Sequence, residues 1–183
     1  MKFALIALSL AALLPLSASA QQRNLSYTYG EAGYVNADGD ADGAYVKGSY
    51  DFGQSGVYGF GQYGRLEVDN SNFKLKPFEL GAGYHYSLSG NTDLLGEAAY
   101  ARVDTDVGDA EGYRASIGVR SALSPRFDGL AKVNYRDGRD FNGNTTVTLG
   151  TEYHITPTWG VVGEAELGDH DARLYNVGVR ASF

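Results

Sequence analysis

The chain has 183 residues, with 22 acidic and 15 basic side chains, a formal net charge of −7 and no cysteine. The lack of cysteine excludes a disulfide framework and a lipid-modified cysteine. The acidic balance argues against a nucleic-acid partner, because phosphate binding needs a surplus of Lys and Arg.

The first 20 residues have the pattern of a secretory signal peptide. Lys2 precedes the apolar run Phe3–Leu16, and Ala18-Ser19-Ala20 then forms an A-x-A cleavage pattern. The run is too short to favour a membrane-spanning helix, and no later segment is apolar enough for one. We therefore expect export and cleavage after Ala20, which leaves a mature chain, 21–183, with 14 basic and 22 acidic residues.

From residue 25 onward, apolar and polar residues alternate with the period of β-strands. The alternation defines about ten segments of roughly 9–12 residues, near the length that a tilted strand needs to cross a bilayer. Segments 57–68 and 94–103 fit less cleanly, and 25–35 is ambiguous because Glu31 shares the parity of Tyr27 and Tyr29, which a bulge would reconcile. In chain order, the segments are 25–35, 44–52, 57–68, 77–88, 94–103, 113–123, 127–135, 147–155, 159–167 and 174–183.

The connections between these segments are of two kinds, which alternate strictly. Short turns on one side and longer loops on the other are typical of transmembrane barrels, with the turns in the periplasm. We therefore predict an all-β fold, a closed antiparallel transmembrane β-barrel of eight to ten strands, with ten favoured. The short connections are 53–56, 89–92, 124–126 and 156–158; the longer, Asp/Asn/Gly-rich ones are 36–43, 69–76, 104–111, 137–144 and 168–172.

Aromatic residues on the apolar parity gather near the strand ends, and small or aliphatic residues lie between them. Membrane barrels have this arrangement, because aromatic side chains lie at the two membrane interfaces and an apolar band lies between them. A soluble β-sandwich, the alternative, would place its largest rings in the middle of its core. The predicted aromatic girdle consists of Phe52, Tyr58, Tyr86, Tyr100, Tyr113, Phe127, Tyr135, Tyr153, Trp159, Tyr175 and Phe183.

The opposite parity carries charged residues of both signs, which we expect to face the lumen and to pair. Unpaired charge there would cost several kcal/mol. Two residues stand on the apolar parity against this scheme: Arg102, at the outer end of its segment, and Gln62, near the middle of its segment, which the pattern leaves unexplained. The predicted interior charge network is Lys47, Arg65, Glu67, Glu79, Glu97, Arg114, Arg120, Lys132, Glu152, Glu164, Glu166 and Arg180.

Several stretches resemble a known family of barrels. They are "SYTYGEAGYV", "DADG", "VKGSYDF", "ELGAGYHYSLSGNTDL", "IGVRSALSP" and the closing "VGVRASF". Together they resemble the small outer-membrane barrels of the xanthomonad Ax-type family, known as diffusible-signal or immunity-activating proteins, and more broadly the OmpA/OmpX-like barrels. The resemblance implies that the last strand, which ends in Phe183, is recognised by the outer-membrane assembly machinery. It supplies no catalytic residues.

Three stretches contain residue types that could support chemistry. The stretch Asp38–Gly43 opens like a calcium loop, but the twelfth position is Ser49 rather than glutamate, so we expect an acidic hairpin loop. A hydrolase site would use His85, or His154 with Glu152, beside Ser87 or Ser182. A protease-like rim would use His170 between Asp169 and Asp171. We interpret these as structural or solvated residues, and expect no catalytic residue, no cofactor and no metal.

These observations predict a monomer in the outer membrane of a Gram-negative cell, reached after export, with outer-membrane lipid and lipopolysaccharide as partners. The predicted function is envelope structure, lipopolysaccharide contact or adhesion through the loops 36–43, 69–76, 104–111 and 137–144. A narrow ion-conducting pore is the main alternative, because a small barrel with a charged lumen is also porin-like. An outer-membrane hydrolase and a secreted signalling protein are the remaining alternatives.

Overall fold

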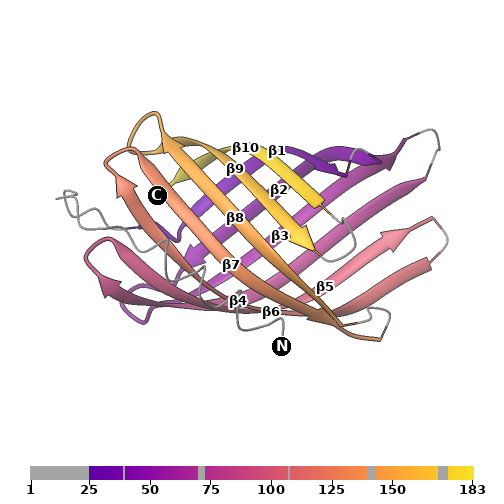
Figure 1. Cartoon of the computed structure of the whole chain (residues 1–183), viewed down its shortest axis with the longest axis horizontal. Coiled ribbons are helices and arrows are strands. Elements are labelled where there is room, and N and C mark those ends of the chain that lie inside the picture. Colours follow the sequence, from indigo (N-terminus) through magenta and orange to yellow (C-terminus); the bar gives the residue numbers. More distant parts are fainter. Residues whose placement is uncertain (1–24, 39, 70–72, 107, 140–142, 169–172) are drawn as a thin grey trace.

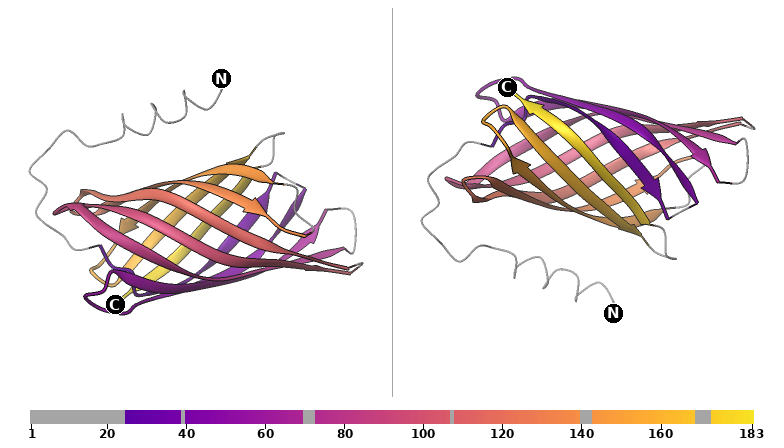
Figure 2. Two further views of the ribbon diagram at one scale, coloured as in Figure 1. Left: turned by 90° about the horizontal axis from the view of Figure 1, so that it is seen from below. Right: turned by 90° about the horizontal axis from the view of Figure 1, so that it is seen from above.

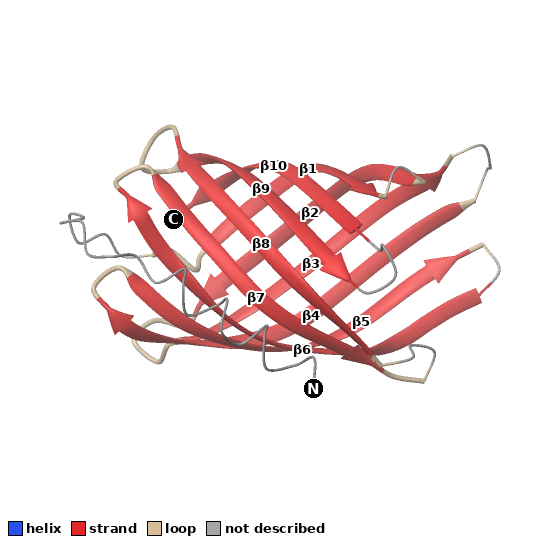
Figure 3. Cartoon of the chain, in the orientation of Figure 1, coloured by secondary structure: helices blue, strands red, loops and turns tan. Residues whose placement is uncertain are grey.

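The computed structural model describes residues 25–38, 40–69, 73–106, 108–139, 143–168 and 173–183. The predicted signal peptide, 1–20, and the candidate rim residues Asp169, His170 and Asp171 lie outside the described residues. Every regular element that is described is a β-strand (Figure 3). Among the described residues, no helix is both long enough and apolar enough to cross a membrane.

Ten antiparallel strands form one closed barrel, as the alternation predicted (Figure 1). Each strand pairs with its neighbours in sequence, and β1 pairs with β10 from Tyr29↔Ser182 to Ala37↔Leu174 to close the sheet. Closure leaves no open strand edge, which lipid could not satisfy. The strands are β1 Tyr29–Ala37, β2 Ala41–Asp51, β3 Val57–Val68, β4 Lys74–Ser89, β5 Thr92–Thr105, β6 Gly108–Ser124, β7 Phe127–Asp137, β8 Asn144–His154, β9 Trp159–Gly168 and β10 Arg173–Ser182.

The two ends of the barrel differ. The turn end carries the start of β1, the C-terminal Phe183 and the short turns after β2, β4, β6 and β8. Figure 2 shows the barrel from two opposite sides, with the C-terminus at this end in both views. The loop end carries the connections after β1, β3, β5, β7 and β9. The loops are shorter than predicted, because polar residues such as Asp42 and Lys74 continue the strand ladders. The longest strands, β4 and β6, have 16 and 17 residues, and the β3–β4 and β5–β6 hairpins project furthest (Figure 1).

The outer face of the barrel is apolar. Ile117, Leu80 and Val177 are each about three-fifths exposed. So many exposed aliphatic side chains on one surface fit hydrocarbon rather than water. The strand β1 shows no bulge: Tyr27 and Glu31 share one parity, and both are buried inside the barrel.

The strand β3 faces the opposite way from the prediction. Tyr58 and Leu66 point inward, being 3% and 4% exposed, whereas Arg65 and Glu67 are exposed on the outside. Tyr58 therefore does not belong to the outer aromatic girdle, and Arg65 and Glu67 do not belong to the interior network. The physical reason is that the lumen accepts apolar groups: the Tyr58 hydroxyl donates to Glu97 (2.9 Å), and Leu66 packs in an apolar cluster. The inversion also explains the polar Gln62, which lines the lumen.

Candidate functional site

The lumen holds two groups of charged side chains, the first of which we call the central network. It consists of four bases and four acids: Lys47, Glu79, Glu97, Arg114, Lys132, Arg136, Glu164 and Glu166. Arg114 Nη2 lies 2.9 Å from Glu79 Oε2, and Lys132 Nζ lies 3.0 Å from Glu97 Oε2. Its other contacts include Lys47 Nζ to Glu164 Oε2 (2.5 Å) and Arg136 Nη1 to Glu166 Oε1 (2.9 Å). Positive and negative charges therefore balance in this part of the lumen.

Neutral polar groups extend the central network. Asn134 is almost fully buried and donates its amide hydrogens to Thr146 Oγ1 (3.0 Å) and Thr148 Oγ1 (2.8 Å), while its oxygen accepts from Ser116 (2.8 Å). The Arg114 guanidinium also donates to Ser116 (2.7 Å). Such satisfied hydrogen bonds are what a buried polar cluster needs in order to be stable.

The second group, the turn-end network, has more acids than bases. It consists of Glu31, Asp51, His85, Asp93, Arg120, Asp128, Glu152, His154 and Arg180. Arg120 Nη2 lies 3.1 Å from Asp128 Oδ2 and 3.2 Å from Glu152 Oε2. Arg180 bridges Glu31 (Nη2 to Oε2, 2.6 Å) and Glu152 (Nη1 to Oε2, 2.9 Å), and thereby ties β10 to β1 and β8.

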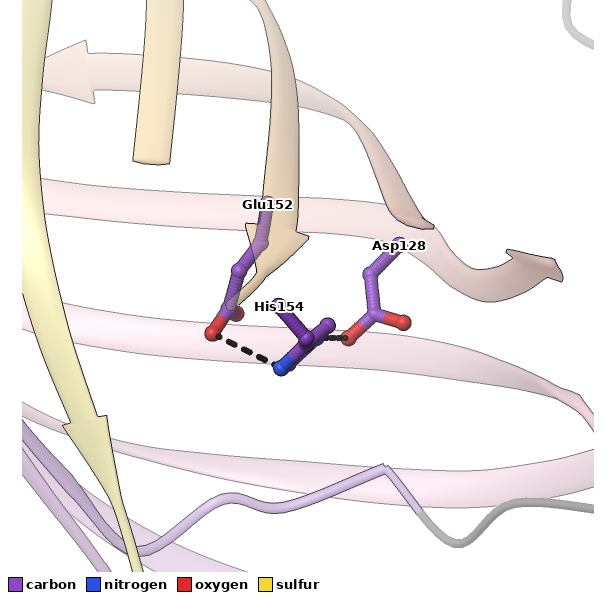
Figure 4. A group of neighbouring side chains, drawn as sticks. All are labelled: Asp128, Glu152 and His154. Atoms are coloured by element: carbon purple, nitrogen blue, oxygen red, sulfur yellow. Dashed lines mark hydrogen bonds and ion pairs between the residues drawn. The ribbon is translucent and has the colours of Figure 1, made fainter. Parts of the chain in front are cut away.

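His85 and His154, the two histidines in the described part of the chain, each lie between two carboxylates. His154 Nε2 is 3.1 Å from Asp128 Oδ2, and its Nδ1 is 3.6 Å from Glu152 Oε1 (Figure 4). His85 Nε2 is 3.4 Å from Asp51 Oδ2, and its Nδ1 is 3.7 Å from Asp93 Oδ2. The serine near His85 has another partner, since Ser87 Oγ donates to Asp93 Oδ1 (2.7 Å).

Apolar groups occupy the lumen at both ends. At the turn end, Tyr27 stacks on His85 with ring centroids 4.1 Å apart, and it forms a buried cluster with Tyr58 and Leu95. Its hydroxyl donates to Asp93 (2.9 Å). At the loop end, the cluster is Val35, Ala41, Tyr45 and Leu66. Between them, the lumen retains a cavity of about 140 Å³, lined by residues of both networks.

The predicted site residues are distributed as follows. Ten of the twelve predicted interior charges lie in the two networks; Arg65 and Glu67 lie outside, where Glu67 Oε1 is 3.8 Å from Lys74 Nζ. The predicted girdle residues other than Tyr58 are exposed on the outer face, with Trp159 52% and Phe183 79% exposed. Arg102 lies on the outer face too, where it pairs with Asp104 and with Asp109 Oδ2 (2.7 Å).

Sequence reasoning missed several lumenal residues. Glu31, Asp93, Asp128 and Arg136 all belong to the networks but were absent from the predicted set. The parity of Asp128 with Lys132 was a usable signal for that residue. Arg136 lies one residue past the predicted end of its strand, and the ambiguous segment 25–35 concealed Glu31.

The stretch Asp38–Gly43, which opens like a calcium loop in sequence, does not form a loop of the length that calcium binding requires. β2 begins at Ala41, so that Asp42 pairs with Asn36 in the β1–β2 ladder. The Asp42 carboxylate accepts a hydrogen bond from the Tyr34 hydroxyl (2.6 Å). The described part of Asp38–Gly43 is therefore a tight hairpin connection followed by a strand.

Comparison with known proteins places the fold. No protein-family model and no curated protein matches the chain. A KdgM porin, whose structure was determined in complex with disordered oligogalacturonate, matches with a TM-score of 0.57 and 13% identity, over 85% of this chain and 99% of that chain. A NanC porin in a rhombohedral crystal form matches with a TM-score of 0.57 and 11% identity, over 85% and 100%.

Identities this low show the fold alone. The structural matches support the broader resemblance, to small outer-membrane barrels. Membership of the xanthomonad Ax-type family stays a prediction. Together with the apolar outer face, they support an outer-membrane location. The chain has the fold of an outer-membrane β-barrel, with porins among its structural neighbours.

Proposed function

We propose that this protein is a sealed outer-membrane barrel that acts through its outer surface, in envelope structure and in contact with anionic outer-leaflet lipid such as lipopolysaccharide. The observation that carries the proposal is the pairing of charged side chains across the lumen, with an apolar cluster toward each end and a cavity of about 140 Å³ between them. In this proposal the protein is a monomer, has no catalytic role, and is inserted by the assembly machinery through its last strand.

The energetics of the networks favour a sealed lumen. A solute that crossed the barrel would have to separate pairs such as Arg114–Glu79 and Arg120–Asp128, whose side chains are less than 10% exposed. Removing one partner of a buried pair typically costs about 3–5 kcal/mol, because the other charge is left without compensation. Each step along the lumen would meet such a barrier, so the networks stabilise a rigid interior.

The outer surface above the girdle supplies groups for lipid phosphate. Arg65 is exposed there, and Lys74 lies opposite Glu67 on the neighbouring strand. Lys76 lies opposite Asp104 in the next ladder. Basic groups at headgroup depth attract anionic lipid, and the acidic partners between them could share divalent cations with lipid phosphates.

A planar-bilayer recording of the folded, mature protein tests the proposal. We expect no single-channel steps from the wild-type barrel. As a positive control, the double variant Tyr58→Ala and Tyr27→Ala removes two stacked rings from the turn end (centroids 5.1 Å apart) and should permit measurable current. Regular conductance steps from wild-type protein, with folding verified by heat-modifiable gel mobility, would contradict a sealed lumen.

The second candidate is a narrow ion-conducting pore. It is favoured by the shared fold with KdgM and NanC porins and by the continuous line of charged side chains along the lumen. Passage of acidic sugars, suggested by the oligogalacturonate complex of the KdgM porin, fits less well, because acids outnumber bases in the turn-end network. If the pore candidate holds, Glu79→Gln or Arg120→Gln should change the single-channel conductance.

A further inference from the structure

The turn-end network contains more buried negative charge than its bases can compensate. Four buried carboxylates, from Glu31, Asp93, Asp128 and Glu152, and the partly exposed Asp51 face the guanidinium groups of Arg120 and Arg180. Lys47 also lies 3.7 Å from Glu31, but it pairs more closely with Glu164. Buried charges are tolerated when they are paired or bind a metal. The surplus therefore calls for an additional cation among these side chains.

The two carboxylate oxygens of Glu152 differ in their partners. Oε2 accepts hydrogen bonds from Arg120 Nη2 (3.2 Å) and Arg180 Nη1 (2.9 Å), whereas Oε1 is buried without a hydrogen-bond partner. The Glu152 side chain is 3% exposed, so water outside the barrel does not solvate it. Oε1 points toward His154 Nδ1, 3.6 Å away (Figure 4).

The hydrogen bond on the other side of the imidazole fixes the proton of His154. Nε2 lies 3.1 Å from Asp128 Oδ2, and an ionised carboxylate only accepts hydrogen bonds, so Nε2 carries the hydrogen. In the neutral ring, the Nδ1 lone pair then faces Glu152 Oε1, and two acceptors oppose each other. A carboxylate that holds the distal N–H in this way is the usual support of a metal-binding histidine.

The distance between His154 Nδ1 and Glu152 Oε1 fits two ligands of one metal ion better than it fits a hydrogen bond. An N–H···O hydrogen bond spans about 2.7–3.2 Å, shorter than the 3.6 Å between Nδ1 and Oε1. Two ligands of a tetrahedral Zn²⁺, each about 2.0–2.2 Å from the metal, lie about 3.4 Å apart. One potential ligand atom from each of Asp128, Glu152 and His154 lies within 4.8 Å of the other two.

We propose that this cluster binds a divalent transition-metal ion of the Zn²⁺ class. His154 Nδ1 and Glu152 Oε1 are the protein ligands, Asp128 positions the imidazole, and water from the adjoining cavity completes the coordination. A mixed nitrogen and oxygen site selects Zn²⁺ and its neighbours over Ca²⁺ and Mg²⁺, which prefer oxygen ligands alone. The proposal does not depend on whether the barrel conducts.

The site was not expected from the sequence, because Asp128 is far from the other two residues along the chain. The β7–β8 ladder pairs Asp128 directly with Glu152, and His154 follows on the same face of β8. Both proposed ligands lie on β8, and arginines of β6 and β10 hold the other oxygen of Glu152 in place.

Calorimetric titration of the tag-free mature barrel in detergent, after removal of metal with a chelator, tests the proposal with Zn²⁺ as the probe. We expect one Zn²⁺ per barrel at pH 7.5, with no comparable uptake of Ca²⁺ or Mg²⁺. His154→Ala should lower the Zn²⁺ affinity at least about tenfold. The matched control is His85→Ala, which should leave the Zn²⁺ affinity unchanged. His85 also lies between two carboxylates, but these are more exposed than the partners of His154. The side chains of Asp51 and Asp93 are 25% and 10% exposed, whereas those of Asp128 and Glu152 are each 3% exposed.

Three outcomes would overturn the proposal: no Zn²⁺ uptake by the wild-type barrel, an equal loss in both histidine variants, or equal binding of Ca²⁺. If His154→Ala does not fold, as judged by heat-modifiable mobility, the wild-type barrel loaded with Cu²⁺ gives a second readout. Its electron paramagnetic resonance spectrum should show hyperfine coupling to one imidazole nitrogen. A spectrum from oxygen ligands alone would also overturn the proposal.

Discussion

The central network and the turn-end network lie in the same lumen and use the same residue types, but they differ in charge balance. In the central network, four acids face four bases, and each ion pair joins different strands. In the turn-end network, five acids face two arginines and two histidines. Lys47 and Arg180 connect the two networks, through Glu31 (3.7 Å) and Glu164 (3.9 Å). The comparison teaches that acids and bases are equal in number in the central network, whereas the turn-end acids depend on every base that is present and, in our proposal, on a further cation.

The largest loss of stability is expected when an arginine is removed from the turn-end network, where acids outnumber bases. Arg120→Met leaves Asp128 and Glu152 without their shared guanidinium, and we expect the free energy of unfolding to fall by about 3–5 kcal/mol. Urea unfolding in detergent, followed by the fluorescence of the single tryptophan, Trp159, measures it. The control Arg102→Met removes an exposed pairing on the outer face and should lower the free energy of unfolding far less. Equal losses would remove the distinction between lumen and exterior.

The next effect concerns the apolar part of the turn end. Tyr58→Ala empties a buried site beside Tyr27 and removes the donor to Glu97, so we expect a loss of about 3 kcal/mol. Tyr63→Ala, on the outer face of the same strand, should cost about 1 kcal/mol or less. If Tyr63→Ala costs more than Tyr58→Ala in the same unfolding measurement, the assignment of the two faces of β3 is wrong.

Neutralising one acid in each network should lower the free energy of unfolding by clearly different amounts. Glu97→Gln removes the charge that Lys132 and Arg114 share, and we expect a loss of about 2 kcal/mol. Asp51→Asn lowers the turn-end surplus and should change the free energy of unfolding by less than about 0.5 kcal/mol. A larger loss for Asp51→Asn than for Glu97→Gln would show that the balance of charge is not what distinguishes the networks.

The smallest expected change in stability tests whether the turn after β2 packs against β4. Gly53 and Gly56 both have positive φ, at 82° and 71°. Alanine at Gly53 meets no atom within 4 Å, so only the backbone strain of about 1 kcal/mol is expected. Alanine at Gly56 would also approach the His85 carbonyl oxygen at 2.7 Å, so it should lower the unfolding midpoint further. Equal midpoints for the two variants would mean that this turn is not packed against β4.

The fold could be predicted from the sequence because the alternation of apolar and polar residues shows which side chains of a strand lie on the outer face. In β10, Tyr175, Val177 and Val179 alternate with polar residues, and that pattern alone sets which side meets lipid. The same reasoning failed in β3, because a small lumen also buries rings and aliphatic groups such as Tyr58 and Leu66. Apolar character therefore does not by itself identify the lipid-facing side.

The partners within the lumen could not be predicted from the sequence. Arg180 and Glu31 are 149 residues apart and meet only because β10 closes against β1 in one register. The surplus of acids at the turn end likewise depends on which side chains share a depth in the barrel, and so on the stagger of all ten strands. Parity gives the face of a residue, but depth and pairing come from the assembled sheet.

The central claim is that the charged parity is sealed inside and the apolar parity faces hydrocarbon. Nitroxide labels at two adjacent positions of β8, Leu149 and Thr148, test it in barrels reconstituted into lipid vesicles, because Leu149 is 43% exposed and Thr148 is 6% exposed. We expect the label at 149 to collide with lipid-dissolved oxygen and to be shielded from a water-soluble relaxation agent, with the label at 148 shielded from both. Strong oxygen collisions at 148 together with a water-exposed label at 149 would contradict the account.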